Sequence, residues 1–181
     1  MKNKLNNRLF YITEYNSPIG KLSIFSDGIN IVEIRLPKTR FPMLDEKSAI
    51  KMNKLEAFKL VRTWLDSYFA KQNPSPNDLP LKFFGSDFQC KVMTLLREIP
   101  YGTVTTYKDI ARKISPKMSA QAVGNAVGHN PLCIVVPCHR VIGKNNNLVG
   151  FGGGLDAKKF LLSHEGVDLS KFKTPTKGNA L

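Results

Sequence analysis

The chain has 181 residues, with 27 Lys and Arg against 14 Asp and Glu, and its formal net charge is +13. This length suits one domain or two small ones with a sizeable core. The apolar stretches are too short to span a membrane, and residues 1–7 are too polar for a signal peptide. The positive charge favours a polyanion such as nucleic acid, although a basic protein without a specific partner explains the charge equally well.

The number and spacing of the cysteines indicate the cellular compartment of the protein. Cys90, Cys133 and Cys138 are few, odd in number and without framework spacing. Such cysteines are typical of reduced thiols, so we expect a cytoplasmic protein.

Residues 1–80 predict an N-terminal α/β scaffold domain with a small antiparallel sheet. Three alternating runs are expected to be strands, over residues 9–15, 21–26 and 29–36, joined as a meander. Apolar residues at helical spacing predict a helix over 53–71. The segment Asn73-Pro74-Ser75-Pro76-Asn77 is the best linker candidate. No residue before Pro80 indicates chemistry.

Residues 81–170 predict a mostly helical C-terminal domain, so the fold class is α+β. Helices are expected over residues 87–98, 106–114 and 119–128, with Ser86 and Ser119 as N-caps, and a further helix from about Asp156. The two short helices joined by a tight break form a helix-turn-helix candidate. Residues 171–181 are expected to be a flexible tail.

The helix predicted over 119–128 carries glycine on its exposed face. Gly124 shares that face with Gln121, Asn125 and Gly128, although glycine inside a helix costs about 1 kcal/mol relative to alanine. Either a nucleic-acid backbone approaches closely, or the glycine packs tightly against the protein's own core. Only Gln121 and Asn125 could read base edges, so the helix suits a DNA backbone or minor groove better than sequence readout.

The tetrapeptide Pro137-Cys138-His139-Arg140 follows the apolar run 133–136, which predicts a buried strand. A thiol at the end of such a strand could be a metal ligand, a buried structural cysteine or a nucleophile. The usual paired metal-ligand spacings do not occur, which argues against zinc. The structural interpretation fits Cys133 and Cys90, and the nucleophile interpretation fits Cys138.

A nucleophilic thiol needs a base, and His139 is the nearest candidate. Successive side chains of an extended backbone point to opposite sides, so a bridging water is favoured over direct contact with Cys138. A base also needs an orienting acceptor, for which Glu165 is the candidate. The alternative is that Glu165 is a solvated residue at a helix end.

These residues resemble the active-site signature of the methylated-DNA–protein-cysteine S-methyltransferases, the O6-alkylguanine-DNA alkyltransferases. The signature matches Pro137-Cys138-His139-Arg140-Val141-Ile142. Further motifs match at 101–107, 122–124, 130–131, 153–155 and 161–166. Order and spacing agree from about Phe88 to Gly166, whereas the N-terminal part resembles the family's α/β domain more loosely.

The resemblance implies DNA repair by direct damage reversal: an irreversible, stoichiometric alkyl transfer from O6-methylguanine to Cys138, with O4-methylthymine as an open second substrate. The partner would be double-stranded DNA, bound through the minor groove with the damaged base flipped out. The protein would be a monomer needing neither metal nor cofactor.

The resemblance also implies roles for single residues. His139 would be the base acting through water, Glu165 its orienting acceptor, Tyr107 the proton donor to the departing guanine, and Asn130 a hinge. Contacts to DNA would come from Ala120, Gln121, Gly124, Asn125 and Arg140, and the base pocket from Phe151, Gly152 and Gly153.

Two positions depart from the family pattern. Gln121 stands where the family usually has an arginine that fills the space left by the flipped base, which predicts weaker DNA binding or less ready flipping. Gly152 stands where the family often has a small or hydroxyl residue. Two rival functions remain: a thiol hydrolase using Cys138, and a DNA-binding regulator without chemistry.

Overall fold

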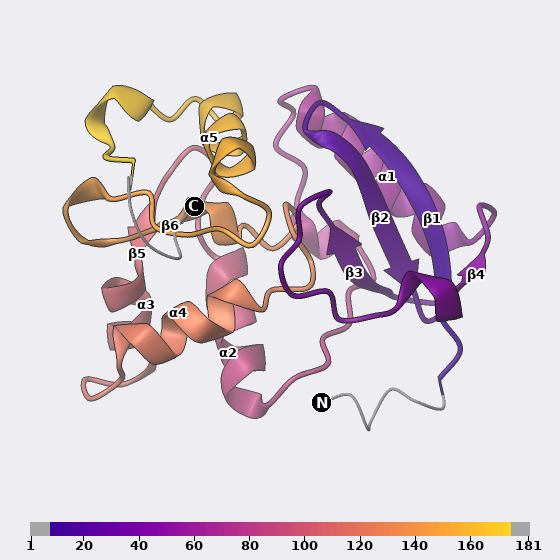
Figure 1. The fold of residues 1–181 in the computed structure, drawn as a ribbon, viewed down its shortest axis with the longest axis horizontal. Coiled ribbons are helices and arrows are strands. Elements are labelled where there is room, and N and C mark those ends of the chain that lie inside the picture. The colour runs from indigo at the N-terminus through magenta and orange to yellow at the C-terminus, as the bar shows by residue number, and fades with distance from the viewer. Residues whose placement is uncertain (1–7, 175–181) are drawn as a thin grey trace.

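The computed structural model describes residues 8–174, and its helices and strands fall into two groups that lie side by side (Figure 1). The first group holds β1 (Tyr11–Ser17), β2 (Gly20–Ser26), β3 (Ile31–Arg35), β4 (Ile50–Lys51) and α1 (Glu56–Phe69). The second holds α2 (Asp87–Arg97), β5 (Thr105–Thr106), α3 (Tyr107–Ile114), α4 (Ala120–Gly128), β6 (Val141–Ile142) and α5 (Leu155–His164). The α+β class predicted from the sequence is confirmed.

The first group contains a four-stranded sheet in the order β3-β2-β1-β4. β1, β2 and β3 form the predicted antiparallel meander, with Ser17 paired to Gly20 across the first turn. Gly20 has a φ of 102°, which glycine adopts most easily. β4 pairs parallel to β1. It was not predicted, because two exposed residues at a sheet edge show no alternation.

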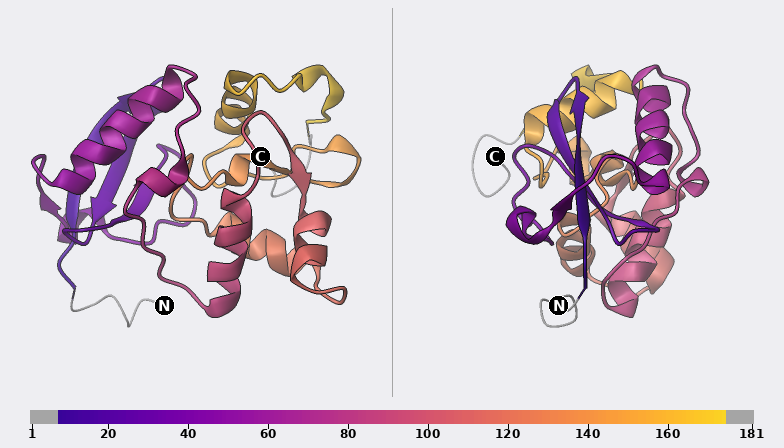
Figure 2. Two further views of the ribbon diagram at one scale, coloured as in Figure 1. Left: turned by 180° about the vertical axis from the view of Figure 1, so that it is seen from behind. Right: turned by 90° about the vertical axis from the view of Figure 1, so that its right-hand side faces the viewer.

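Helix α1 lies across one face of this sheet (Figure 2). Its Phe58, Val61 and Leu65 are fully buried and pack with Leu22 and Ile24 of β2. Successive residues of a strand point to opposite faces, and the opposite face of β2 and β3 buries its own apolar cluster beneath the segment after β3. That second cluster contains Phe10, Ile12, Phe25, Val32 and Leu44.

The helices of the second group begin at the predicted caps. The Ser86 side chain accepts from the backbone N–H of Gln89 and forms a capping box with it at the start of α2. Ser119 caps α4 by accepting from the N–H groups of Gln121 and Ala122. The structured connection between α3 and α4 is short, as the sequence predicted.

The edge of the sheet binds the second group directly. The N–H of Ile34 in β3 donates to the carbonyl of Pro131 at 2.7 Å, and the N–H of Cys133 donates to the carbonyl of Ile34 at 3.3 Å. The main hydrophobic core includes residues of both groups, such as Leu65 of α1 and Leu96 of α2. The segment just before Cys138 is therefore anchored to the N-terminal sheet.

The buried strand predicted over residues 133–136 is wrong. The segment is a coiled turn, in which the N–H of Val136 bonds to the carbonyl of Leu132 at 2.8 Å and Ile134 has a φ of 73°. Leu132, just before this stretch, makes an isolated bridge to Ile34. The apolar run arises because the turn is buried on all sides, and burial alone does not specify a strand.

The end of the described chain makes backbone hydrogen bonds. The N–H of Lys173 donates to the carbonyl of Asn146 and the N–H of Leu148 donates to the carbonyl of Lys173, both at 2.9 Å. The flexible tail predicted from residue 171 stays a prediction, although Lys173 makes these two backbone bonds. Residues 175–181 lie outside the described residues, as do residues 1–7. None of the described helices has the length and apolar character needed to cross a membrane.

Candidate active site

Cys138 begins a short turn of helix, residues 138–140, and its side chain is buried. Asn130 holds this turn by three hydrogen bonds. Its amide nitrogen donates to Cys138 Sγ at 3.0 Å and to the carbonyl of Val136 at 2.8 Å, and its amide oxygen accepts from the N–H of Leu132 at 3.0 Å. These bonds fix the sulfur in position, and the role of Asn130 as a hinge stays a prediction.

The surroundings of Cys138 favour its thiolate. The pKa of Cys138 is lowered by a hydrogen bond from the Cys133 side chain and further by the Asn130 amide and the charge of Lys158, against the effect of burial. The same hydrogen bond raises the pKa of Cys133 well above its ordinary value. Cys133 therefore keeps its proton, and Cys138 is the more nucleophilic of the two.

Lys158 of α5 is completely buried, which is rare for lysine. Its Nζ donates to the carbonyls of Val141 at 2.7 Å and Val149 at 3.0 Å. Burial lowers its pKa to about 8, although the negative charge of Cys138 opposes this effect. The sequence analysis did not identify Lys158; the available signal was a lysine among the inward-facing leucines of α5.

Glu165 forms the centre of a buried ion cluster. It accepts from His139 Nε2 at 2.7 Å, from Arg140 Nε at 2.7 Å and from Tyr68 Oη at 2.8 Å. The N–H of Gly102 adds a contact at 3.1 Å. Burial alone would raise the pKa of Glu165, but the bonds and charges of His139 and Arg140 hold it well below its usual range. The alternative of a solvated Glu165 is wrong.

His139 uses one ring nitrogen for this cluster, and its Nδ1 bonds to none of the residues in the described range. The ring is fully buried, and burial lowers the pKa of His139 although Glu165 opposes the effect. The imidazole is therefore neutral near neutral pH. A relay from Cys138 to His139 through water stays a prediction.

Arg140 is not placed to bind DNA, which contradicts the expectation. Its side chain is 7% exposed, and its guanidinium makes a two-point ion pair with Glu165 and donates to the carbonyl of Ile99 at 2.6 Å. The planar fork of arginine matches a carboxylate in this way. Arg140 therefore supports the cluster from inside.

Cys138 faces a small cavity of about 50 Å³. Phe151 and Gly152 line it as expected. Tyr107 and Gly124 also line it, and the N-terminal half contributes Thr39 and Phe41. Phe41 is 54% exposed and stacks on His129, with the ring centroids 4.6 Å apart.

Gly153 is not among the residues that line this cavity; it is buried and lines a separate hollow with Pro37 and Phe160. A Cβ added there would come within 2.5 Å of Leu36 Cδ1, so the loop needs glycine to pack against the segment after β3. Gly124 differs, because its added Cβ would meet the Tyr107 ring at an ordinary 3.7 Å. Packing within the protein therefore does not require glycine at position 124.

The cavity also contains a phenol that stays protonated. Burial raises the pKa of Tyr107 to about 12, with a further contribution from the charge of Cys138. Its hydroxyl can therefore donate a hydrogen bond or a proton over the ordinary pH range. On α4 nearby, Ala120, Gln121 and Asn125 are exposed.

Two profiles of one protein family match the chain. The DNA-binding domain of 6-O-methylguanine DNA methyltransferase matches residues 87–167, and the ribonuclease-like domain of the same family matches residues 10–83. This chain belongs to the 6-O-methylguanine DNA methyltransferase family. A methylated-DNA–protein-cysteine methyltransferase of Haemophilus influenzae is 41% identical over 157 residues, covering 87% of each chain. One of Methanosarcina acetivorans is 39% identical over 158 residues, covering 86% of this chain and 98% of the relative.

Solved structures of the methyltransferase family have the same fold. The crystal structure of Mycobacterium tuberculosis OGT in complex with DNA has a TM-score of 0.76 and 34% identity. The match covers 90% of this chain and 94% of that one.

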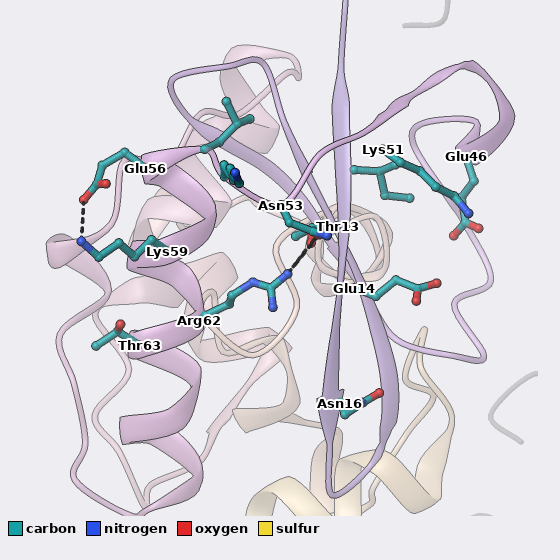
Figure 3. A pocket seen from close by; sticks show the side chains of 13 residues that line it. Thr13, Glu14, Asn16, Glu46, Lys51, Asn53, Glu56, Lys59, Arg62 and Thr63 are labelled. Atoms are coloured by element: carbon teal, nitrogen blue, oxygen red, sulfur yellow. Dashed lines mark hydrogen bonds and ion pairs between the residues drawn. The ribbon is translucent and has the colours of Figure 1, made fainter.

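This methyltransferase family member also has a hollow that is larger than the cavity at Cys138. A hollow of about 950 Å³ lies between β1 and the start of α1 (Figure 3). Arg62 reaches across it to Thr13, which in turn donates to Asn53 at 2.6 Å. It holds no cysteine or histidine. Among residues 8–174, no group of three or more His, Cys, Asp or Glu is placed to hold a metal ion.

The N-terminal half contributes residues to this site that were not predicted from the sequence. Tyr68 of α1 bonds to Glu165, and Phe41 lines the cysteine cavity. Neither carries a local signal, because an aromatic residue in an amphipathic helix or a loop is usually structural. Cys90, expected to be buried, is half-buried in α2 and lines a different hollow.

Proposed function

We propose that this protein repairs O6-alkylguanine in double-stranded DNA by moving the alkyl group to Cys138, once per molecule. The observation that carries the proposal is a buried thiol of lowered pKa, facing a cavity beside the exposed glycine-containing face of α4. The sulfur forms a bond to the alkyl carbon as the bond from that carbon to O6 breaks. Guanine leaves with the electron pair and gains a proton, and the thioether persists because nothing in the reaction reverses it.

The size of the cavity supports base flipping. About 50 Å³ is far below the 300–1,000 Å³ or so of ordinary ligand pockets, and Cys138 is only 5% exposed. A base stacked in a duplex cannot reach such a sulfur, so the damaged nucleotide leaves the stack and the walls around Phe41 and Phe151 open to admit it.

The face of α4 supports binding in the minor groove. Ala120, Gln121 and Asn125 of α4 are exposed and Gly124 is half-buried. All four side chains are small or short, which allows a DNA backbone to approach closely. Gln121, in the first turn, is placed to occupy the gap that the flipped base leaves. We propose α3 and α4 as the helix-turn-helix, with a monomer binding one lesion in the cytoplasm.

Each residue around the sulfur has a proposed part. Asn130 and Cys133 hold the Cys138 thiolate by hydrogen bonds, and Tyr107 donates a proton to the departing base. The neutral imidazole of His139, oriented by Glu165, takes the Cys138 proton through water when the thiol is protonated. The reaction balances without a metal or cofactor.

The test is a mass measurement of the intact protein after incubation with duplex DNA carrying O6-methylguanine. We expect one added methyl group, located on Cys138 by peptide mapping, and none in Cys138→Ser. Cys90→Ser is the matched control, because Cys90 lines a different hollow, and it should gain the methyl group normally. Release of methanol with an unmodified protein would indicate the hydrolase, and DNA binding without any transfer would indicate the regulator. The same assay on O4-methylthymine decides the second substrate.

The substitution Gln121→Arg is expected to tighten DNA binding and speed transfer. One added phosphate contact steepens the slope of log affinity against log salt by about 0.9. Gln72→Arg adds the same charge after α1, away from α4, and should change the slope little. Fluorescence anisotropy over a salt series measures the slope, and single-turnover methyl transfer measures the rate. Equal slopes and rates in wild type and Gln121→Arg would refute the role assigned to this position.

A further inference from the structure

Two thiols share the cavity at Cys138, and the proposed repair reaction consumes only one. Cys133 and Cys138 both line it, with exposed fractions of 6% and 5%. Both sulfurs are tethered to one residue: Cys133 Sγ donates to the Asn130 carbonyl at 3.8 Å, and Cys138 Sγ accepts from the Asn130 amide at 3.0 Å. The Cys133 side chain is also the largest cause of the lowered pKa of Cys138.

The turn between the two cysteines explains why they meet. The N–H of Val136 bonds to the carbonyl of Leu132, and the N–H of Cys138 bonds to the carbonyl of Val136, both at 2.8 Å. These bonds coil residues 132–138 into a compact loop. An extended strand, as predicted from the sequence, would have carried Cys133 well away from Cys138.

The cavity admits small oxidants in its closed state. A water molecule needs about 10–15 Å³ of such space, so about 50 Å³ accommodates hydrogen peroxide. The same volume excludes a nucleobase. The resting protein therefore exposes its thiolate to peroxide before any substrate arrives.

We infer that Cys133 and Cys138 form an intramolecular disulfide when the protein meets hydrogen peroxide. Cys138 thiolate attacks one peroxide oxygen, the O–O bond breaks, and a sulfenic acid forms with release of hydroxide. The sulfur of Cys133 then attacks the sulfenic sulfur, its proton and the hydroxyl group leave as water, and the S–S bond forms. Overall, two thiols are oxidised and one peroxide is reduced to two waters.

The disulfide closes the alkyl acceptor reversibly. While the S–S bond lasts, Cys138 is not a thiolate and cannot accept an alkyl group, and a thiol reductant restores the thiolate. If no second thiol were close enough to react, the sulfenic acid would be oxidised further to the sulfinic acid. Thiol reductants do not reverse this second oxidation. Cys133 thus protects an acceptor that can be used only once.

The experiment treats the free full-length protein with hydrogen peroxide and records the intact mass and tryptic map before and after dithiothreitol. Wild type should lose two hydrogens, show a Cys133–Cys138 cross-link and regain its mass on reduction. Cys133→Ser should instead gain two oxygens on Cys138 and not recover. Cys90→Ser should behave as wild type.

This assay involves no DNA, so its failure and the failure of the proposed repair function are separate results. A wild-type protein that goes directly to the sulfinic acid would overturn the inference. A cross-link that involves Cys90, or one between two molecules, would overturn it as well. Circular dichroism on Cys133→Ser establishes that the variant is folded before its oxidation is compared.

Discussion

The substitution Glu165→Gln is expected to lower the free energy of unfolding by about 3–5 kcal/mol, the usual cost of removing one partner from a buried ion pair. Glutamine keeps the shape of Glu165 but removes the charge that faces Arg140, and its amide N–H groups meet the donors of Arg140 and Tyr68. Arg140 then stays buried without a counter-ion. Alkyl transfer should slow by about 100-fold or more, because His139 loses the acceptor that orients it.

The pH dependence of this difference has a definite sign. The folded-state pKa of Glu165 is lowered, so its stabilisation is complete above the unfolded value of about 4.3 and is lost as pH falls toward the folded value. The stability gap between wild type and Glu165→Gln should therefore narrow from neutral pH to about pH 3. Because folding lowers the pKa of His139, the stability of both wild type and variant falls as the pH falls below about 6.5.

Urea unfolding at the two pH values measures the gap, and Glu98→Gln is the matched control. Glu98 is exposed at the end of α2, so its substitution should change stability little. A gap that is small at neutral pH, or that widens in acid, would contradict the cluster as the source of stability.

The elements that could be predicted from the sequence are those specified by local chemistry. Ser86 and Ser119 accept from the first turn of their helices, and the apolar period of α1 points at the sheet, so both signals lie within a few residues. The nucleophile was also predictable, because Cys138 lies in a specific motif. No direct hydrogen bond between His139 and Cys138 was expected, because the two residues are adjacent. In the structure, His139 Nε2 bonds to Glu165 instead.

The environment of Cys138 could not be predicted, because it depends on residues far apart in the chain. Tyr68 and Glu165 are 97 residues apart and meet through the contact between the two groups of elements. The same limit explains the error on Arg140. A basic residue beside a DNA-repair motif suggests phosphate binding, and only the fold shows that Arg140 forms an ion pair with the buried carboxylate of Glu165. The strand predicted over residues 133–136 is wrong for a third reason. An apolar run indicates that a segment is buried but does not determine its backbone conformation.

The substitution Lys158→Met is expected to slow alkyl transfer at neutral pH without unfolding the protein. Methionine is similar in length and suits an apolar site. The variant loses the positive charge that lowers the pKa of Cys138, so the pKa of Cys138 rises. At neutral pH, each unit of rise in this pKa lowers the thiolate fraction by about tenfold. Two lost hydrogen bonds, to the carbonyls of Val141 and Val149, are offset by relief from burying a charge.

Stability and rate should then respond to pH differently in the two proteins. Folding lowers the pKa of Lys158 to about 8 from an unfolded value of about 10.4, so the unfolded chain binds more protons than the folded one between these two values. The stability of wild type therefore rises as the pH rises from about 8 to about 10.4. Lys158→Met lacks this gain. Its transfer rate should recover at alkaline pH, where the thiolate forms without help, whereas a misfolded pocket would stay slow at every pH. Lys159→Met, the adjacent half-buried lysine, is the control and should keep the wild-type profile. Single-turnover rates across the alkaline range decide between the two explanations, because only lost electrostatic support is restored by raising the pH.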